Sequence, residues 1–381
     1  METLIYLDYN ATTPHDSEVV SAIKPYVEEY FGNPSSSHLY GLKTREAVEQ
    51  ARCQVASLLN CSPSEIVFTS GGTESNNYAI KGIAFAHRHK GNHIITTVIE
   101  HPAVLEVCRF LEKHGFSVTY LPVDKYGLVN PSELERAVTD KTILVTVMHA
   151  NNEVGTVQPI EEISAITKKK GIVFHTDAAQ SAGKISIDVK ELGVELLSIA
   201  GHKLYAPKGI GVLYIKDGIK PEKFMHGAGH EGGRRAGTEN VLEIVGLGKA
   251  CEIAGRDLRK NGEHMKQMRD RLHSGLEQRI KDIKLNGHRE KRLPNTLSLS
   301  FKDINSSELI QKLNDKLAVS AGAACHTGKI SYVLEAMNIP REWSRGTVRF
   351  STGKMTEEIE IDRAVNLIEI VMRNALNKVE S

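Results

Sequence analysis

The sequence predicts an α/β fold with a large, mostly parallel mixed-sheet domain and a second, smaller α+β domain. From about residue 65, short runs rich in β-branched residues alternate with segments of helical spacing. Strands that alternate with helices in this way form parallel sheets covered on both faces. After Gly237 the pattern changes to one long helical stretch and a mixed tail. The length of 381 residues also suits two domains better than one.

The elements of the large domain can be followed in order along the chain. Helical segments such as residues 76–89 and 102–113 separate runs that predict parallel strands. The expected strands are residues 65–69, 93–99, 117–123, 142–148 and 172–176. Two further runs, residues 195–200 and Gly211–Ile215, leave little room for a helix between them, so we expect an antiparallel member in the sheet.

The small domain follows a helix predicted over residues 241–282, whose densely polar second half suits a connector between domains. The remaining elements are expected to be a strand, a helix, a strand and a closing helix, at residues 295–301, 307–314, 347–351 and 357–377. We assign residues 16–255 to the large domain, and residues 1–15 together with 256–381 to the small one. By pattern alone, residues 1–15 could belong to either.

Composition and charge narrow the class of protein. Lys and Arg number 48 and Asp and Glu 47, a formal net charge of +1, which argues against nucleic acid or an anionic membrane as the main partner. No run approaches the roughly 18 apolar residues of a membrane span, and the start, METLIYLDYN, lacks the basic lead of a signal peptide. The five cysteines are scattered and without a CxxC pair, so we expect a cytoplasmic protein with neither a disulfide framework nor a metal site.

Two motifs directly follow predicted strands. In SGGTESNN (residues 70–77), Gly72 and Thr73 open a helix, where a glycine lets the backbone approach an anion and free N–H groups favour phosphate. A plain strand-to-helix turn with a Thr cap is the alternative. In FHTDAAQ (residues 174–180), Asp177 ends a parallel strand at the edge where ligands bind in such sheets, although a helix-capping role fits equally well.

Lys203 lies farther along the chain, in the segment SIAGHKLYAPKG. A surface lysine is the ordinary interpretation, but the apolar run before it predicts a buried strand end, where a lysine needs a partner. Pyridoxal phosphate (PLP) chemistry needs a lysine for the Schiff base, an acid on the pyridine nitrogen and a phosphate cup. Lys203, Asp177 and the pair Gly72 and Thr73 supply that set, and together they favour a PLP enzyme.

Cys325 stands in SAGAACHTG (residues 320–328), among residues too small and flexible for core packing. Most single cysteines are inert core residues. Here the following His326 could lower the pKa of the thiol, as a reactive cysteine requires. The segment therefore favours a reactive thiol in a loop.

Several lesser features allow two interpretations each. His101, in IEHP, is either a helix cap or core residue, or a catalytic histidine stacked on a ring. The run NNEVG (residues 151–155) could be only a turn, and RRAGTEN (residues 234–240) only a solvated basic loop. Arg349 could simply lie on the exposed face of a strand. None of these features decides the function alone.

The sequence resembles the cysteine desulfurase family of fold-type-I PLP enzymes over nearly its whole length. The matching pieces occur in family order: YLDYNATTP, GNPSSSH, FTSGGTESNN, EHPAV, HANNEVG, HTDAAQ, GHKLYAPKG, RRAGTEN, the Cys325 loop and VRFSTG. The fold that this resemblance implies has a large, mostly parallel mixed-sheet domain that binds PLP and a smaller α+β domain that carries the cysteine loop.

The resemblance also implies a role for each motif residue. Lys203 would form the Schiff base, His101 would stack on the ring and move protons, and Cys325 would take the sulfur. The implied cofactor contacts are Asp177 to the pyridine nitrogen, Gln180 to the ring oxygen, Asn152 near the ring, Gly72, Thr73 and His202 to the phosphate, and Thr238 to the phosphate of a second copy of the chain. Arg349, with Asn152, would bind the substrate carboxylate, a bidentate task suited to a guanidinium.

The implied activity removes sulfur from L-cysteine, which gives L-alanine and a persulfide on Cys325 that passes to acceptors for iron–sulfur cluster or thio-cofactor assembly. The freed Lys203 would remove the α-proton, charge would spread toward Asp177, and the Cys325 thiolate would attack the substrate sulfur. The expected partners are therefore L-cysteine, a sulfur-acceptor or scaffold protein, and a second copy of the chain in a homodimer.

At two positions the sequence differs from the housekeeping desulfurases and is similar to selenocysteine lyases. Ala200 stands where those desulfurases carry Ser, and His326 follows the cysteine where they carry Ser or Thr. By contrast, the segment RRAGTENV resembles the nitrogen-fixation branch of the cysteine desulfurases. A selenocysteine lyase that gives alanine and selenide is thus the main alternative. A silent scaffold for sulfur-acceptor proteins is a remote one, because Lys203, Asp177 and His101 are all intact.

Overall fold

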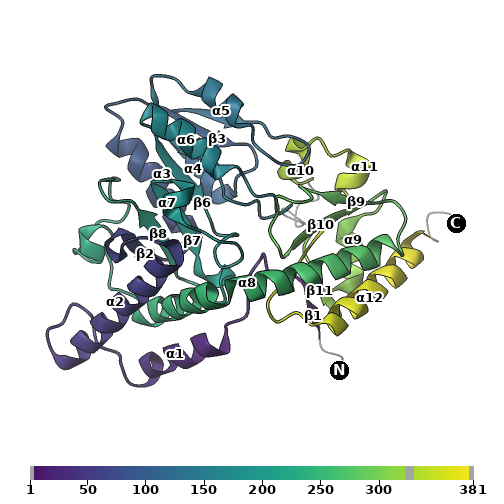
Figure 1. Cartoon of the computed structure of the whole chain (residues 1–381), viewed down its shortest axis with the longest axis horizontal. Coiled ribbons are helices and arrows are strands. Elements are labelled where there is room, and N and C mark those ends of the chain that lie inside the picture. Colours follow the sequence, from purple (N-terminus) through teal and green to yellow (C-terminus); the bar gives the residue numbers. More distant parts are fainter. Residues whose placement is uncertain (1–3, 322–329, 377–381) are drawn as a thin grey trace.

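The structure is a computed structural model that describes residues 4–321 and 330–376 (Figure 1). Within these residues, a seven-stranded sheet has the order β2-β8-β7-β6-β5-β3-β4. Its strands are β2 (Ile66–Thr69), β3 (His93–Thr97), β4 (Ser117–Leu121), β5 (Thr142–Thr146), β6 (Val173–Asp177), β7 (Leu196–Ala200) and β8 (Gly211–Ile215). Strand β8 is antiparallel to both β7 and β2, and the other pairings are parallel. The predicted mixed, mostly parallel sheet is confirmed, with β8 as its antiparallel member.

The two antiparallel pairings of β8 give β2 the same direction as β7. The carboxyl ends of β2, β7, β6, β5 and β3 therefore meet at one edge of the sheet, and the segments that follow these strands hold most of the motifs found in the sequence. Nearly every residue of these strands is buried, which explains why their runs are almost continuously apolar or β-branched.

Helices cover both faces of this sheet. Along β2 the side chains alternate: Ile66 and Phe68 belong to one hydrophobic cluster and Val67 to the other. The first cluster contains residues of α1 (Ser17–Glu28), α2 (Leu39–Leu59), α5 (Pro131–Ala137), α6 (Ile160–Lys170), α7 (Val189–Leu192) and α8 (Val241–Glu277). The second contains residues of α3 (Gly72–Ala86) and α4 (Pro102–Glu112). The helix predicted from residue 76 thus begins earlier, at Gly72. None of the described helices is long and apolar enough to cross a membrane.

The predicted α+β unit is also present. An antiparallel sheet has the order β12-β10-β9, with β12 (Thr347–Ser351), β10 (Thr296–Phe301) and β9 (Ile283–Asn286), and β1 (Ile5–Tyr6) pairs in parallel with β11 (Leu317–Ala318). Helices α9 (Ser306–Leu313) and α12 (Glu358–Leu376) pack with these strands, and α10 (Tyr332–Ala336) and α11 (Arg341–Ser344) lie between β11 and β12 in the chain. Ile5 and Leu7 are buried in the same cluster, which favours grouping the N-terminal segment with this unit.

Helix α8 joins the two units (Figure 1). Its residues from Ile244 to Ala254 pack in the large-sheet cluster, and Met268, Leu272 and Leu276 pack in the small-sheet cluster. The helix was predicted to reach residue 282, but it ends at Glu277 because the chain turns: Asp282 has a φ of 54°, which a helix cannot contain, and β9 follows. The domain boundary at residue 255 stays a prediction.

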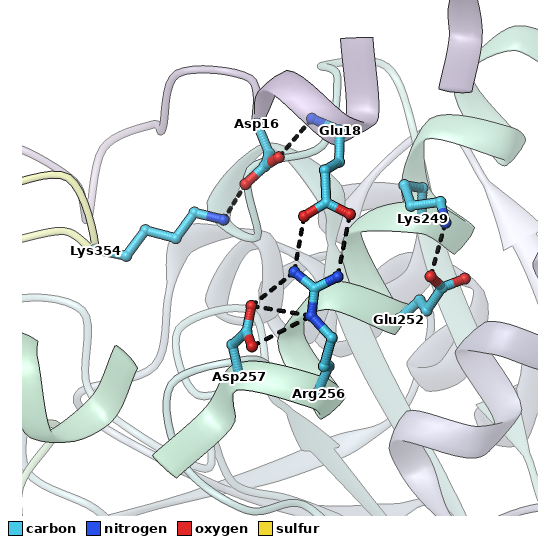
Figure 2. Close-up of polar contacts among 7 residues, drawn as sticks. All are labelled: Asp16, Glu18, Lys249, Glu252, Arg256, Asp257 and Lys354. Carbon is cyan, nitrogen blue, oxygen red and sulfur yellow. Dashed lines mark hydrogen bonds and ion pairs between the residues drawn. The ribbon is translucent and has the colours of Figure 1, made fainter. Parts of the chain in front are cut away.

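A charged network crosses the middle of α8 (Figure 2). Arg256 of α8 donates to both oxygens of Glu18 in α1 and also to Asp257. Asp16 caps the start of α1 and pairs with Lys354, which lies just beyond β12. The network therefore links three distant parts of the sequence where the two units meet.

Candidate active site

A cavity of about 330 Å³ lies at the sheet edge where the parallel strands end. Small-molecule pockets span roughly 300–1,000 Å³, so this one is small. Its lining includes most residues that the sequence singled out: Gly72, Thr73, His101, Asn152, Asp177, Gln180, His202, Lys203 and Arg349. Thr238 is exposed and does not line the cavity of its own chain, and Cys325 lies outside the described residues.

Lys203 ends the short 3₁₀ helix η2 (Gly201–Lys203), which continues directly from β7. The side chain is half-buried, and its amine forms no hydrogen bond or ion pair with the described residues. Burial is the main cause that lowers the pKa of Lys203 to about 8, while nearby Asp177 opposes this shift and Arg349 adds to it. The surface-lysine interpretation is therefore wrong, and near neutral pH this amine is uncharged far more often than an ordinary lysine.

Asp177 is buried at the end of β6, with both carboxylate oxygens bonded. Its Oδ2 accepts a hydrogen bond from Asn76 Nδ2 at 2.6 Å, and its Oδ1 accepts one from Ala179 N at 2.9 Å. The second contact is a cap, but on a turn and not on a helix. Sequence reasoning missed Asn76, although its spacing from Gly72 places both residues on one face of α3. Asn76 Oδ1 is buried and has no partner among the described residues.

His101 is a helix cap that also faces the cavity, and its catalytic role stays a prediction. It is the N-cap of α4, since Nδ1 accepts a hydrogen bond from Ala103 N at 3.1 Å, and it also lines the cavity. The cap makes Nδ1 an acceptor, so the neutral ring carries its proton on Nε2. Burial is the main cause that lowers the pKa of His101, with Asp177 opposing and Lys203 adding to the shift. The imidazole is thus neutral near pH 7.

Arg349 is buried in β12, so the exposed-face interpretation is wrong. Its guanidinium pairs with Asp8 Oδ1 at 2.9 Å and donates to the backbone oxygen of Asn152 at 3.0 Å. Arg349 Nε and Asn152 Oδ1 are buried, and neither has a hydrogen-bond partner among the described residues. In the NNEVG run, Asn151 does form a turn by accepting from two backbone N–H groups, while Asn152 lines the cavity.

The start of α3 lies against the end of β7. Gly71 is the N-cap and no side chain caps this helix, so the Thr-cap interpretation is wrong. Gly71 has a φ of 149°, a conformation that side-chain-bearing residues rarely adopt. A Cβ on Gly72 would lie 3.2 Å from the Ala200 Cβ, so both small residues keep this corner of the cavity open. Burial and nearby lysines lower the pKa of His202 to about 4, which leaves that ring neutral.

The RRAGTEN segment is not a solvated basic loop. Arg235 Nε pairs with Glu74 Oε1 in the first turn of α3 at 2.9 Å. Arg234 donates to the backbone oxygens of Ile66 and Ser64 at 2.9 and 2.7 Å. These contacts fix the loop that presents Thr238 to solvent.

The chain on either side of the Cys325 segment is anchored at the cavity wall. Before it, the backbone of Ser320 pairs with that of Arg349. After it, Ser331 Oγ donates to Glu153, and the Tyr332 hydroxyl donates to the backbone oxygen of Glu100 at 2.7 Å. Glu153 and Glu100 directly adjoin the cavity residues Asn152 and His101.

The donor set of this cavity fits PLP. It offers a free amine, a buried carboxylate and an uncapped helix start, the parts that PLP needs. The buried atoms Asn76 Oδ1, Asn152 Oδ1 and Arg349 Nε also lack partners within the described chain, as expected of groups that meet a ligand. The described residues contain no group of three or more His, Cys, Asp or Glu side chains placed to hold a metal ion.

Known proteins resemble this chain over nearly its full length. Residues 5–364 match the aminotransferase class-V family. A cysteine desulfurase IscS of Dictyoglomus turgidum is 48% identical over 375 residues, which cover 98% of this chain and 95% of that protein. The cysteine desulfurase IscS of Methanosarcina thermophila is 48% identical over 376 residues, which cover 98% and 93%.

Solved structures agree with these sequences. A NifS-like protein superposes with a TM-score of 0.93 at 40% identity, and the match covers 97% of this chain and 100% of that one. SspA in complex with cysteine superposes with a TM-score of 0.83 at 38% identity, covering 92% and 99%. The chain therefore belongs to the PLP-dependent aminotransferase class-V family and, within it, to the cysteine desulfurases.

Proposed function

We propose that the chain is a cysteine desulfurase that converts L-cysteine to L-alanine and holds the sulfur as a persulfide on Cys325. The observation that carries the proposal is that Lys203, Asp177 and Arg349, from three different elements, line one cavity. The relatives support the same substrate, because those in sequence are named cysteine desulfurases and one solved relative is in complex with cysteine.

Each cavity residue has a task in this proposal. Bound PLP supplies an aldehyde that condenses with amines and a ring that accepts electrons. Lys203, with its lowered pKa, would hold the aldehyde and would serve as the base for the α-proton. Asp177, oriented by Asn76, would pair with the protonated ring nitrogen. His101 moves protons through Nε2 while its Nδ1 stays bound to the helix start.

Arg349 would bind the substrate carboxylate. Its Nε is unpartnered among the described residues, while Asp8 and the backbone oxygen of Asn152 hold the two terminal nitrogens. Asn152 lines the same cavity, and its amide N–H would reach the carboxylate beside Arg349. A charge-assisted pair of this kind fixes orientation as well as affinity.

Cys325 would perform the sulfur transfer. Its thiolate attacks the sulfur of the bound substrate, an S–S bond forms as the Cβ–S bond breaks, and the electron pair remains with the carbon fragment, which becomes alanine after protonation. The anchors at Ser320, Ser331 and Tyr332 support this role, because they hold both neighbouring segments at the cavity wall.

The proposal includes a homodimer, an acceptor protein and a cytoplasmic location. Thr238 is exposed and does not line the cavity of its own chain, as expected if it serves the phosphate site of a second copy. Val27, Phe31 and Leu39 are more than 65% exposed within one short stretch, an apolar surface that a second copy could cover.

Alanine release from L-cysteine and from L-selenocysteine, measured side by side, tests the proposal. We expect the wild type to act on cysteine, and Lys203→Ala to release no alanine from either substrate. Cys325→Ala should lose activity on cysteine but keep a measurable part on selenocysteine, because a selenol is more acidic and the C–Se bond weaker. A strong preference of the wild type for selenocysteine would favour the lyase alternative. Equal loss on both substrates in Cys325→Ala would contradict the persulfide role.

A further inference from the structure

Lys184 is a buried lysine next to the cavity, and it has no carboxylate partner among the described residues. Its side chain is only 5% exposed, and its Nζ donates to Gln180 Oε1 at 3.0 Å. Burial is the main cause that lowers the pKa of Lys184 to about 7, and the other causes are two cations, Lys203 and Arg349. A buried amine among cations is costly unless something else requires it.

The contact with Lys184 determines how the Gln180 amide is oriented. Gln180 is itself 4% exposed, and its Nε2 donates to the backbone oxygen of Asn10 at 3.0 Å. The Asn10 carbonyl can only accept, and the protonated Lys184 amine can only donate, so both partners select the same orientation when Lys184 is charged. The amide oxygen is thereby directed to Lys184 and the nitrogen to Asn10. The second N–H of Nε2 stays available, and Gln180 lines the cavity.

We propose that Lys184 is a positioning residue that holds the Gln180 amide with an N–H available to an anionic oxygen of the bound cofactor. This inference rests on the proposed function, in which Gln180 contacts the ring oxygen of PLP. Without Lys184, only the contact with Asn10 would oppose a turn of the amide that presents Oε1, which repels an anionic oxygen. When protonated, the amine also adds positive charge beside a cavity whose ligands, a phosphorylated cofactor and an amino-acid carboxylate, are anions.

The substitution Lys184→Met tests this role, because it keeps the length of the side chain and removes its donor. The readout is the visible absorption of the bound cofactor, titrated with pH without substrate. Loss of the hydrogen bond to the ring oxygen and loss of a nearby cation both favour the protonated nitrogen of the Lys203–cofactor bond. The pH midpoint of the absorption titration should therefore rise by roughly one pH unit in Lys184→Met. The matched control is Lys190→Met, at an exposed lysine six positions away, which should leave the midpoint unchanged.

A second variant covers the case in which Lys184→Met does not fold. Gln180→Glu keeps a partner for Lys184 but offers no N–H, so it should raise the midpoint in the same direction. In a Gln180→Leu background, Lys184→Met should add little further shift, because the residue through which it acts is gone. A full shift in that background would mean that Lys184 acts directly, and would overturn the positioning role.

Measurements on the wild-type protein distinguish a failure of this inference from a failure of the proposed function. Borohydride reduction followed by mass spectrometry should first locate the cofactor on Lys203. A wild type without cofactor on Lys203 would overturn both proposals. A cofactor-loaded wild type whose midpoint is the same as in Lys184→Met and Gln180→Glu would overturn this inference alone.

Discussion

At Lys203, burial lowers the pKa, Asp177 and Asp8 oppose the shift and Arg349 adds to it, with a net value of about 8. Burial is also the main cause that lowers the pKa of His101; Asp177 opposes this shift as well and Lys203 adds to it, and the ring is neutral near pH 7. A partly neutral amine and a neutral imidazole therefore face one buried carboxylate. Either base can take a proton under ordinary conditions, which suits a site that must remove one proton and deliver another.

The pKa of Lys203 predicts how cofactor loading depends on pH. Only the uncharged amine attacks an aldehyde, so the rate at which the cofactor-free chain binds PLP should rise with pH and level off above about 8. Stopped-flow absorption at the cofactor band measures this rate. Arg349→Met removes one cause of the lowered pKa and leaves Asp8 unpaired, and both changes favour the charged amine. The midpoint should then move upward. A wild-type midpoint near the ordinary lysine value of about 10.4 would contradict the assignment.

Among the structural elements, the turn after η2 is the one that holds Lys203 in place. Tyr205 in this turn has a φ of 62°, an unusual conformation for a residue with a side chain. Its N–H donates to Thr13 Oγ1 at 2.9 Å, its carbonyl accepts from Asp16 N at 3.1 Å, and its hydroxyl accepts from Lys354 N at 2.9 Å. The N-terminal segment and the loop after β12 therefore both hold the turn that follows Lys203.

The ion pair between Asp16 and Lys354 should contribute more to the stability of the fold than the other ion pairs drawn in Figure 2. Both side chains are largely buried, so Lys354→Met leaves a carboxylate with one partner fewer and should lower the free energy of unfolding by about 2 kcal/mol. Lys249→Met is the matched control: it removes a more exposed pair within α8 and should cost only about 0.3–0.5 kcal/mol. Urea denaturation of both variants measures the difference. Equal losses of unfolding free energy in the two variants would show that the pair between Asp16 and Lys354 contributes no more than an exposed pair.

For the whole molecule, periodicity was enough to predict the sheet but not every boundary. The buried strands could be predicted because they are covered on both faces, which leaves continuous apolar runs. The end of α8 could not, because residues 278–282 keep a polar pattern compatible with a helix while the backbone turns at Asp282. Strand β9 was missed for the same reason, since its residues are only partly buried and it reads as a continuation of the helix.

The site was predictable where a residue type carries the chemistry. Lys203 and Asp177 stand out because an amine and a carboxylate at strand ends need an explanation. Asn76 and Lys184 do not stand out in the sequence, because they act through other side chains. Only the folded chain brings Asn76 to Asp177 and Lys184 to Gln180. The buried position of Arg349 likewise depends on tertiary contacts that strand alternation does not reveal.

The proposed homodimer predicts that two defective chains can restore each other. Lys203→Ala removes the cofactor lysine, and Thr238→Val removes a hydroxyl expected to reach the phosphate of the other subunit, so each variant alone should be nearly inactive at limiting PLP. In a hybrid dimer, one site combines the intact Lys203 of one chain with the intact Thr238 of the other. Random pairing makes half of the dimers hybrids with one of two sites intact, so the mixture should recover about a quarter of wild-type alanine release. A mixture of Lys203→Ala with Lys203→Met should recover none. If Thr238 instead serves its own chain, no hybrid site is complete, and the first mixture would be as inactive as the second.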